Sequence, residues 1–448
     1  MTTPRFDQVI PTANDLLGNY FAGSTMETTL IRDSFGTLSV VLPDDAFKDV
    51  SAWNELAQQL HQALGVYSPG ESQLLLKRSD LIDASDIMES PDRVRVPDVP
   101  NTWLVDRLQT NQDWLREPLV EHPLIPTAVA FSIKGGVGRT TAFALWAWSF
   151  ARVGKNVVLV DLDLEAPGVA GLLLDEDHMP DYGLVDWLVE ALNGQADEAL
   201  LRDCLVDCDL ARNEPGRIQV LPAFGKKTSE YVNKLGRIYM PTFASDTCKF
   251  QGLAERLLML LEQLAGLSDR PDLVMLDSRA GLHDIGSAAV TRLGAEVFMF
   301  ARDDYQSWQA YRQLFKHLSN SRSVAVGMGD VDLRWRLKMV GAQLDATESA
   351  KLRFTDSSYG VWSDELYDDE EEKNPRKPAD PVPQVFERED DNAPHSPLFV
   401  QFDSRIKGFD LINPENRPDW NIIETAMGGF FFGATLRMFP DEPIKGDA

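Results

Sequence analysis

Short apolar runs alternate with longer amphipathic stretches through most of this chain. Several runs are rich in β-branched residues and have the length of strands buried on both faces of a parallel sheet. The expected strands are 127–133, 156–160, 218–222, 272–277, 296–300 and 337–342. The expected helices are 140–152, 184–192, 253–264 and 305–318. This alternation predicts an α/β fold with a doubly wound, mostly parallel sheet.

A different pattern precedes this region. Two apolar runs, 28–33 and 38–43, flank a Ser-Phe-Gly turn and predict a β-hairpin. An amphipathic helix is expected at 50–64 and a short strand at 73–76. We therefore expect a small α+β module over residues 1–85.

The stretch 86–125, with Pro91, Pro97, Pro100 and Pro118, predicts an irregular connector. Within it, 102–114 is expected to be helical. Neither the module nor the connector shows an active-site pattern, and their expected role is to contact a partner or to cover the site of the α/β domain. That domain is expected to span 126–448.

A glycine-rich loop follows the strand 127–133 and precedes the helix 140–152. It contains Lys134, Gly135, Gly136, Val137, Gly138, Arg139, Thr140 and Thr141. Glycines let backbone N–H groups turn towards phosphate oxygens, and the following helix adds the positive end of its dipole. Thr140 stands where the hydroxyl of such a loop holds Mg²⁺. The pattern predicts a site for a nucleoside triphosphate and Mg²⁺.

The loop departs from the general pattern at Arg139, where a lysine usually reaches the β- and γ-phosphates. With Lys134 at its front, the loop resembles the deviant Walker A motif of the ParA/MinD P-loop ATPases, in the variant branch that reads KGGVGR. The resemblance implies ATP as the nucleotide, and it implies that Lys134 reaches across a nucleotide-sandwich homodimer to the partner's phosphates. Arginine keeps the charge but is bulkier than an ammonium group. Arg139 is thus either a tolerated replacement or a residue that slows or abolishes hydrolysis.

Two strands that end in carboxylates lie at the spacing of this family. The first leads into Asp161 and Asp163, and the second ends in Asp277. The resemblance implies that Asp163 orients the attacking water, that Asp161 lies near the Mg²⁺ shell, and that Asp277 binds Mg²⁺ through water. Such roles suit phosphoryl transfer, which needs positioning and charge neutralisation. An aspartate at a strand end is by itself also common as a helix cap.

The segment after Asp277 resembles a switch segment of the same family. Gly281 would let the backbone move as the γ-phosphate comes and goes. Arg279 is either a phosphate sensor or half of a surface ion pair, and the ion pair is the interpretation that we favour.

Charge and composition narrow the choice of partner. The 448 residues carry a formal net charge of −27, which argues against nonspecific DNA binding through surface lysines and arginines. An acidic, proline-rich insertion is expected at about 356–392, which contains 13 acidic residues and 4 basic ones. A solvated loop is the favoured interpretation, and a docking segment for a basic partner is the alternative.

Several features indicate a cytoplasmic protein. The first 19 residues lack the apolar stretch of a signal peptide, and no apolar run is long enough to span a bilayer. The three cysteines have no metal-binding spacing and are expected to be reduced thiols. The segment 420–438 lacks the basic polar face of a membrane-surface helix, so it is expected to pack on the α/β domain.

The sequence thus predicts an ATPase, converting ATP and water to ADP and phosphate, that acts as a nucleotide-dependent dimer switch recruiting or regulating a protein partner. A first alternative is a pseudo-ATPase scaffold that holds its nucleotide permanently; Arg139 favours it, and the retained Asp163 and Asp277 oppose it. A second alternative is a regulatory subunit of a multicomponent system, for example in bacterial defence. A kinase is disfavoured because the chain has no tyrosine-rich tail.

Overall fold

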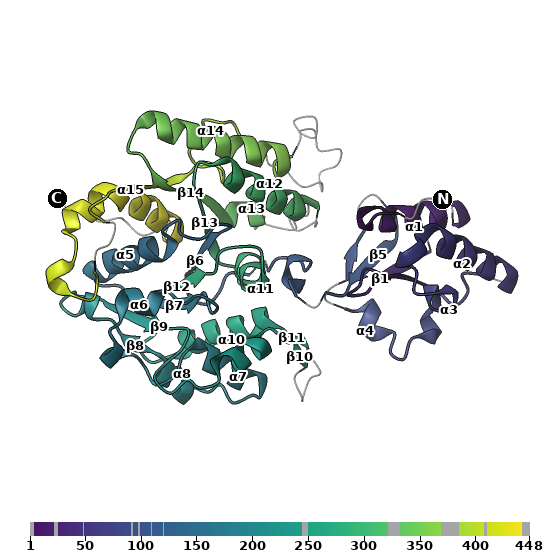
Figure 1. Ribbon diagram of the computed structural model, residues 1–448, viewed down its shortest axis with the longest axis horizontal. Coiled ribbons are helices and arrows are strands. Elements are labelled where there is room, and N and C mark those ends of the chain that lie inside the picture. The colour runs from purple at the N-terminus through teal and green to yellow at the C-terminus, as the bar shows by residue number, and fades with distance from the viewer. Residues whose placement is uncertain are drawn as a thin grey trace. The chain divides into compact units, whose positions relative to one another are not determined.

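The chain forms two compact units, Met1–Arg116 and Glu117–Ala448, in the computed structural model (Figure 1). The structure describes residues 4–21, 26–47, 49–90, 93–96, 99–108, 110–119, 121–243, 250–320, 332–368, 385–406 and 410–440.

The first unit is a five-stranded mixed sheet with two main helices against it. Across the sheet the strands are β3 (Leu75–Lys77), β2 (Leu38–Leu42), β1 (Thr28–Arg32), β5 (Thr102–Asp106) and β4 (Arg93–Arg95). The helices are α1 (Phe6–Tyr20), α2 (Val50–Leu64), α3 (Glu71–Leu74) and α4 (Ser85–Met88). Leu30, Val40 and Leu60 are fully buried in the core that α1 and α2 share with the sheet. The predicted hairpin and the helix 50–64 are confirmed.

The expected helix over 102–114 is wrong. Residues Thr102–Asp106 form β5, which pairs in parallel with β1 and antiparallel with β4. Thr102, Val105 and Asp106 are buried, and Arg32 holds the Asp106 carboxylate in an ion pair. Cross-strand partners distant in the chain thus override the local helical pattern. The predicted connector therefore contributes β4 and β5 to the sheet of this unit.

The second unit confirms the predicted α/β fold with a doubly wound, mostly parallel sheet. Its strands, in order across the sheet, are β15 (Leu398–Gln401), β14 (Leu337–Leu344), β13 (Glu296–Ala301), β6 (Thr127–Ser132), β12 (Leu273–Ser278), β7 (Asn156–Leu162), β9 (Arg217–Leu221) and β8 (Val206–Asp207). All neighbouring pairs are parallel except β8 with β9. Because β6 lies between β13 and β12, the loop that follows it leaves the middle of the sheet.

Helices cover both faces of this sheet (Figure 1). They are α5 (Arg139–Arg152), α6 (Val169–Leu173), α7 (Leu184–Leu192), α8 (Glu198–Cys204), α9 (Tyr231–Ile238), α10 (Leu253–Gly266), α11 (Asp284–Ser287), α12 (Tyr305–Asn320), α13 (Leu333–Arg336), α14 (Glu348–Glu365) and α15 (Trp420–Met438). A two-stranded ribbon joins β10 (Thr242–Phe243) to β11 (Phe250–Gln251). The helices α7, α10 and α12 lie where the sequence predicts them.

The helix α15 packs beside α5 on one side of the sheet (Figure 1). The rings of Trp146 and Phe430 meet edge to face at 5.6 Å, and the Trp146 indole N–H donates to the Thr435 hydroxyl at 3.1 Å. The expected packing of 420–438 on the α/β domain is confirmed, as is the core position of Trp146. Within the described part of the chain, no helix is both long and apolar enough to cross a bilayer.

The predicted start of the acidic insertion is wrong, because helix α14 occupies its first residues. The acidic insertion is expected to begin at residue 356, yet α14 continues to Glu365. Phe354 and Trp362 are fully buried against α12, with ring contacts of 4.9 Å from Phe354 to Trp308 and 5.0 Å from Trp362 to Phe315. Asp364 and Glu365, at the end of α14, pair with Arg312 of α12, so their charges do not prevent the helix from packing there. The most acidic part of the insertion, 369–384, lies outside the described residues.

Two of the three cysteines are free and buried, namely Cys204 and Cys208. Burial raises the pKa of both thiols, which keeps them protonated. Cys248 lies outside the described residues.

Candidate functional site

The glycine-rich loop joins β6 to α5 at the carboxyl edge of the sheet. Gly136 and Gly138 have φ values of +71° and +86°, which residues with a Cβ rarely adopt. Val137 between them is buried and anchors the loop in the core. The side chain of Gln343 donates to the carbonyl of Gly136 at 3.0 Å, so the end of β14 holds the loop from the other side.

Two buried polar atoms beside this loop have no hydrogen-bond partner among the residues that the structure describes. One is Nη1 of Arg139, whose residue is 7% exposed, and the other is Oδ1 of Asp277. Unpaired buried donors and acceptors are costly and call for an explanation. The unpaired donor lies where the loop would hold phosphate, and the unpaired acceptor lies where it would hold a cation.

Thr140 lies between these two groups. Its hydroxyl donates to Oδ2 of Asp277 at 2.6 Å. Thr141 follows on the first turn of α5 and is partly buried. Because no three acidic, histidine or cysteine side chains gather as a metal site in the described residues, Mg²⁺ here would need phosphate and water oxygens besides Thr140 and Asp277. The residues present therefore fit a nucleotide that arrives with its metal ion.

The two strand-end carboxylates are neighbours. Asp161 and Asp277 stand opposite each other in the parallel register of β7 and β12. Burial raises the pKa of Asp161, and the charge of Asp277 raises it further. Burial also raises the pKa of Asp277, although Arg139 and the Thr140 hydroxyl oppose the shift. A divalent cation would relieve this concentration of buried negative charge.

Both carboxylate oxygens of Asp161 accept hydrogen bonds from backbone N–H groups. One of its oxygens accepts from the N–H of Asp163 at 3.0 Å, and the other accepts from the N–H groups of Gly168 and Val169 at 3.1 and 3.0 Å. The carboxylate thus shapes the loop after β7, which favours a supporting role over direct metal contact.

Asp163 lies on the same loop and faces Arg139. Its Oδ2 is 3.9 Å from Nη2 of Arg139, and its Oδ1 accepts from the N–H of Ala166 at 3.2 Å. Burial raises the pKa of Asp163, while the charge of Arg139 opposes the shift. The structure therefore brings Asp163, Arg139, Thr140 and Asp277 together around one point.

Lys134, in contrast, points to a partner in its own chain. Its Nζ donates to Oδ1 of Asp304 at 2.8 Å and to Oε1 of Gln306 at 2.9 Å. Asp304 also accepts from the N–H of Ser307 at 2.8 Å and so caps α12. The sequence analysis predicts neither partner of Lys134. The available signal is the acidic Asp304, which closely follows β13, a neighbour of the strand that leads into the loop.

The segment after β12 contacts the same loops. Gly281 has a φ of +105°, and its N–H donates to the carbonyl of Ser132 at 2.9 Å. Arg279 forms an ion pair with Glu165 at 3.1 Å, in agreement with the favoured interpretation of this residue.

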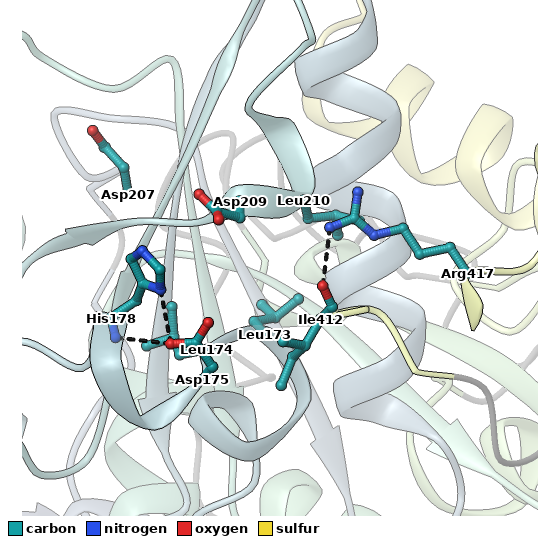
Figure 2. A pocket seen from close by; sticks show the side chains of 9 residues that line it. All are labelled: Leu173, Leu174, Asp175, His178, Asp207, Asp209, Leu210, Ile412 and Arg417. Atoms are coloured by element: carbon teal, nitrogen blue, oxygen red, sulfur yellow. Dashed lines mark hydrogen bonds and ion pairs between the residues drawn. The ribbon is translucent and has the colours of Figure 1, made fainter. Parts of the chain in front are cut away.

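A small pocket in this unit, away from the glycine-rich loop, is shown in Figure 2. It is lined by Leu173, Leu174, Asp175, His178, Asp207, Asp209, Leu210, Ile412 and Arg417. Its polar groups bond locally: the His178 ring lies 2.7 Å from Asp175, and Arg417 donates to the Leu411 carbonyl at 2.7 Å. It includes none of the residues of the glycine-rich loop.

Comparison with known proteins gives partial matches. No family model matches the chain. A putative septum site-determining protein MinD of Oltmannsiellopsis viridis is 44% identical over 79 residues, which are 17% of this chain and 23% of that protein. The septum site-determining protein MinD of Synechocystis sp. is 29% identical over 154 residues, or 34% of this chain and 45% of the relative. The matched segments thus span less than half of these relatives.

Solved structures similar to this one include pNOB8 ParA bound to nonspecific DNA, with 16% identity, coverage of 71% of this chain and 100% of that chain, and a TM-score of 0.40. A complex of a Cyanothece McdA variant with ATP has 14% identity, covers 72% of this chain and 100% of its own, and has a TM-score of 0.41. The second unit has an α/β fold with a doubly wound, mostly parallel sheet, and part of the chain is similar in sequence to MinD proteins.

Proposed function

We propose that the chain binds ATP and Mg²⁺ at Lys134–Thr141, hydrolyses ATP slowly, and works as a nucleotide-dependent dimer switch that recruits or regulates a protein partner. One observation carries the proposal. A buried donor, Nη1 of Arg139, and a buried acceptor, Oδ1 of Asp277, have no hydrogen-bond partner among the described residues. A phosphate would satisfy the first and a hydrated Mg²⁺ the second.

Each residue of the site has a role in this proposal. The amides of Gly135 to Thr141 and the guanidinium of Arg139 bind phosphate oxygens. Thr140 and Asp277 hold the metal ion, and Asp163 orients the attacking water. Asp161 shapes the loop of Asp163 through its three backbone bonds.

The dimer step involves Lys134. In the proposed cycle, Lys134 leaves Asp304 and Gln306 and reaches the phosphates of the second protomer. The pair is partly exposed, so it costs little to break. Hydrolysis then removes the γ-phosphate and with it the contact that holds the dimer closed.

The proposed partner is a protein rather than nonspecific DNA or a membrane. The net charge of −27 opposes binding to phosphate backbones and anionic lipid surfaces. The buried packing of α15 also removes the segment that most resembles a surface anchor.

Nucleotide titration with light scattering tests the proposal. Purified protein is expected to double its mass with ATP and Mg²⁺ but not with ADP, and Asp163→Ala is expected to remain dimeric because it traps ATP. Binding of ATP without any change of mass in either protein would eliminate the switch. No binding at all would eliminate the site.

A permanently occupied scaffold is the second candidate. The observation that favours it is the proximity of Arg139 to Asp163, at 3.9 Å, because a buried guanidinium there competes with water for the carboxylate. This candidate predicts that protein purified without added nucleotide carries about one ATP or ADP per chain, which denaturation and ion-exchange chromatography would detect.

A further inference from the structure

Between β9 and α10, the helix α9 and the residue Tyr239 that follows it contact the loop that carries Asp163. The segment 224–252 contains α9 and the ribbon of β10 and β11, and residues 244–249 of it lie outside the described residues. Among the residues of α9, only Ile238 is buried. Apolar packing therefore explains little of the position of this helix.

Two tyrosine hydroxyls provide the contacts instead. Tyr231, at the start of α9, donates to the carbonyl of Leu164 at 2.5 Å. Tyr239, just after its end, donates to the carboxylate of Glu165. Both acceptors lie directly after Asp163 in the chain. Burial raises the pKa of both tyrosines, so both hydroxyls remain donors at neutral pH.

Other contacts hold α9 in place independently of the loop. Lys234 forms an ion pair with Asp186 of α7 at 2.5 Å. Arg256 of α10 donates to the carbonyls of Ile238 and Met240. The two hydroxyls are therefore presented from a fixed support, as an arrangement that positions a reactive loop requires.

The loop after β7 is thus held by three sets of contacts. Asp161 binds its amides, Arg279 binds Glu165 from the segment after β12, and the two tyrosines bind it from α9. Asp163 keeps its Oδ2 towards Arg139. Such restraint matters because a small misplacement of a group that orients water costs much of its effect.

We propose that Tyr231 and Tyr239 are positioning residues, whose hydroxyls fix residues 163–165 so that Asp163 faces the phosphate site. The inference rests on the proposed function, in which Asp163 orients the attacking water. It assigns α9 and Tyr239 a role in the turnover of the nucleotide.

The test compares Tyr231→Phe and Tyr239→Phe in the full chain, since each removes one oxygen atom and keeps the ring. Tyr367→Phe is the matched control, because the Tyr367 hydroxyl bonds to His395 at 2.7 Å on another part of the same unit. Two readouts are needed: phosphate release with ATP and Mg²⁺, and amide hydrogen exchange of residues 162–168 without nucleotide.

We expect kcat to fall about fivefold in each variant, as the loss of one partly buried hydrogen bond implies, while KM stays within about twofold. Exchange in 162–168 is expected to accelerate in both variants and not in Tyr367→Phe. Exchange at the wild-type rate in this loop, or an unchanged kcat in both variants of an active enzyme, would overturn the inference. If the wild type hydrolyses no ATP, the proposed function fails, and the exchange rates alone decide the inference.

Discussion

The loop after β6 and the loop after β7 leave the same edge of the sheet but differ in how their polar groups are satisfied. Beside the first, Arg139 and Asp277 each have a buried atom without a partner. In the second, Asp161 accepts three backbone hydrogen bonds, and Leu164 and Glu165 are held by tyrosine hydroxyls. The difference suits a first loop whose polar groups are to be satisfied by a bound ligand. In the second loop, contacts within the protein already fix the positions of the polar groups.

Among the proposed substitutions, Asp277→Asn is expected to reduce ATP affinity most. It removes the negative charge that Mg²⁺ requires, so we expect Mg²⁺ to lose its effect on ATP affinity, with a loss of about 100-fold in the presence of the metal. Isothermal titration with and without Mg²⁺ measures this. Asp364→Asn removes a carboxylate paired with Arg312 elsewhere and is expected to bind as the wild type does. Retention of the Mg²⁺ effect in Asp277→Asn would contradict the proposed metal site.

Arg139→Ala removes the unpaired donor. We expect ATP affinity to fall about 30-fold, since hydrogen bonds to charged groups contribute about 1.5–3 kcal/mol each. Arg139→Lys keeps the charge and is expected to retain most of the affinity. Fluorescence titration with an ATP analogue gives both values, and Arg312→Ala provides a control that removes a guanidinium from another surface. Equal affinity in Arg139→Ala and the wild type would place the nucleotide elsewhere.

ATP affinity and protein stability are both expected to depend on pH, because burial raises the pKa of Asp277 to about 6. Below this pH the carboxyl group is protonated and neutral, so ATP affinity with Mg²⁺ is expected to fall about tenfold for each pH unit. The nucleotide-free protein is expected to show the opposite trend: a carboxyl whose pKa is raised by folding, from 3.8 to about 6, contributes stability at low pH that is lost as the pH rises through this interval. Titration at several pH values on both sides of this pKa and thermal unfolding test the two signs. A flat affinity profile in the wild type would contradict the assignment.

The contact of Lys134 with Asp304 predicts the smallest effect. Asp304→Asn removes the ion pair but keeps a side-chain acceptor for the N–H of Ser307, so α12 remains capped. We expect the ATP-dependent dimer to form about threefold more tightly, in line with the small energy of exposed ion pairs. Sedimentation over a range of protein concentrations measures this. A weaker dimer would show that the pair supports the closed state instead.

The parts of the fold and site that depend on local pattern could be predicted from the sequence. The glycines at 136 and 138, the buried strands around the loop and the carboxylates at strand ends are all local signals, whereas the register that places Asp161 opposite Asp277 comes from the structure. The sequence does not predict the strand 102–106, because its parallel partner β1 lies 74 residues earlier in the chain. The contacts of Lys134 with Asp304 and of Tyr231 with Leu164 were missed for the same reason, since 170 and 67 residues separate the partners.

Phosphate release with ATP and Mg²⁺ at several protein concentrations tests the central claim most directly, with Arg139→Lys and Asp163→Ala measured beside the wild type. The account predicts a slow turnover per chain that rises with protein concentration and disappears in Asp163→Ala, because the loop after β7 supplies the group that orients water. A turnover that is independent of concentration, or unchanged in Asp163→Ala, would contradict it.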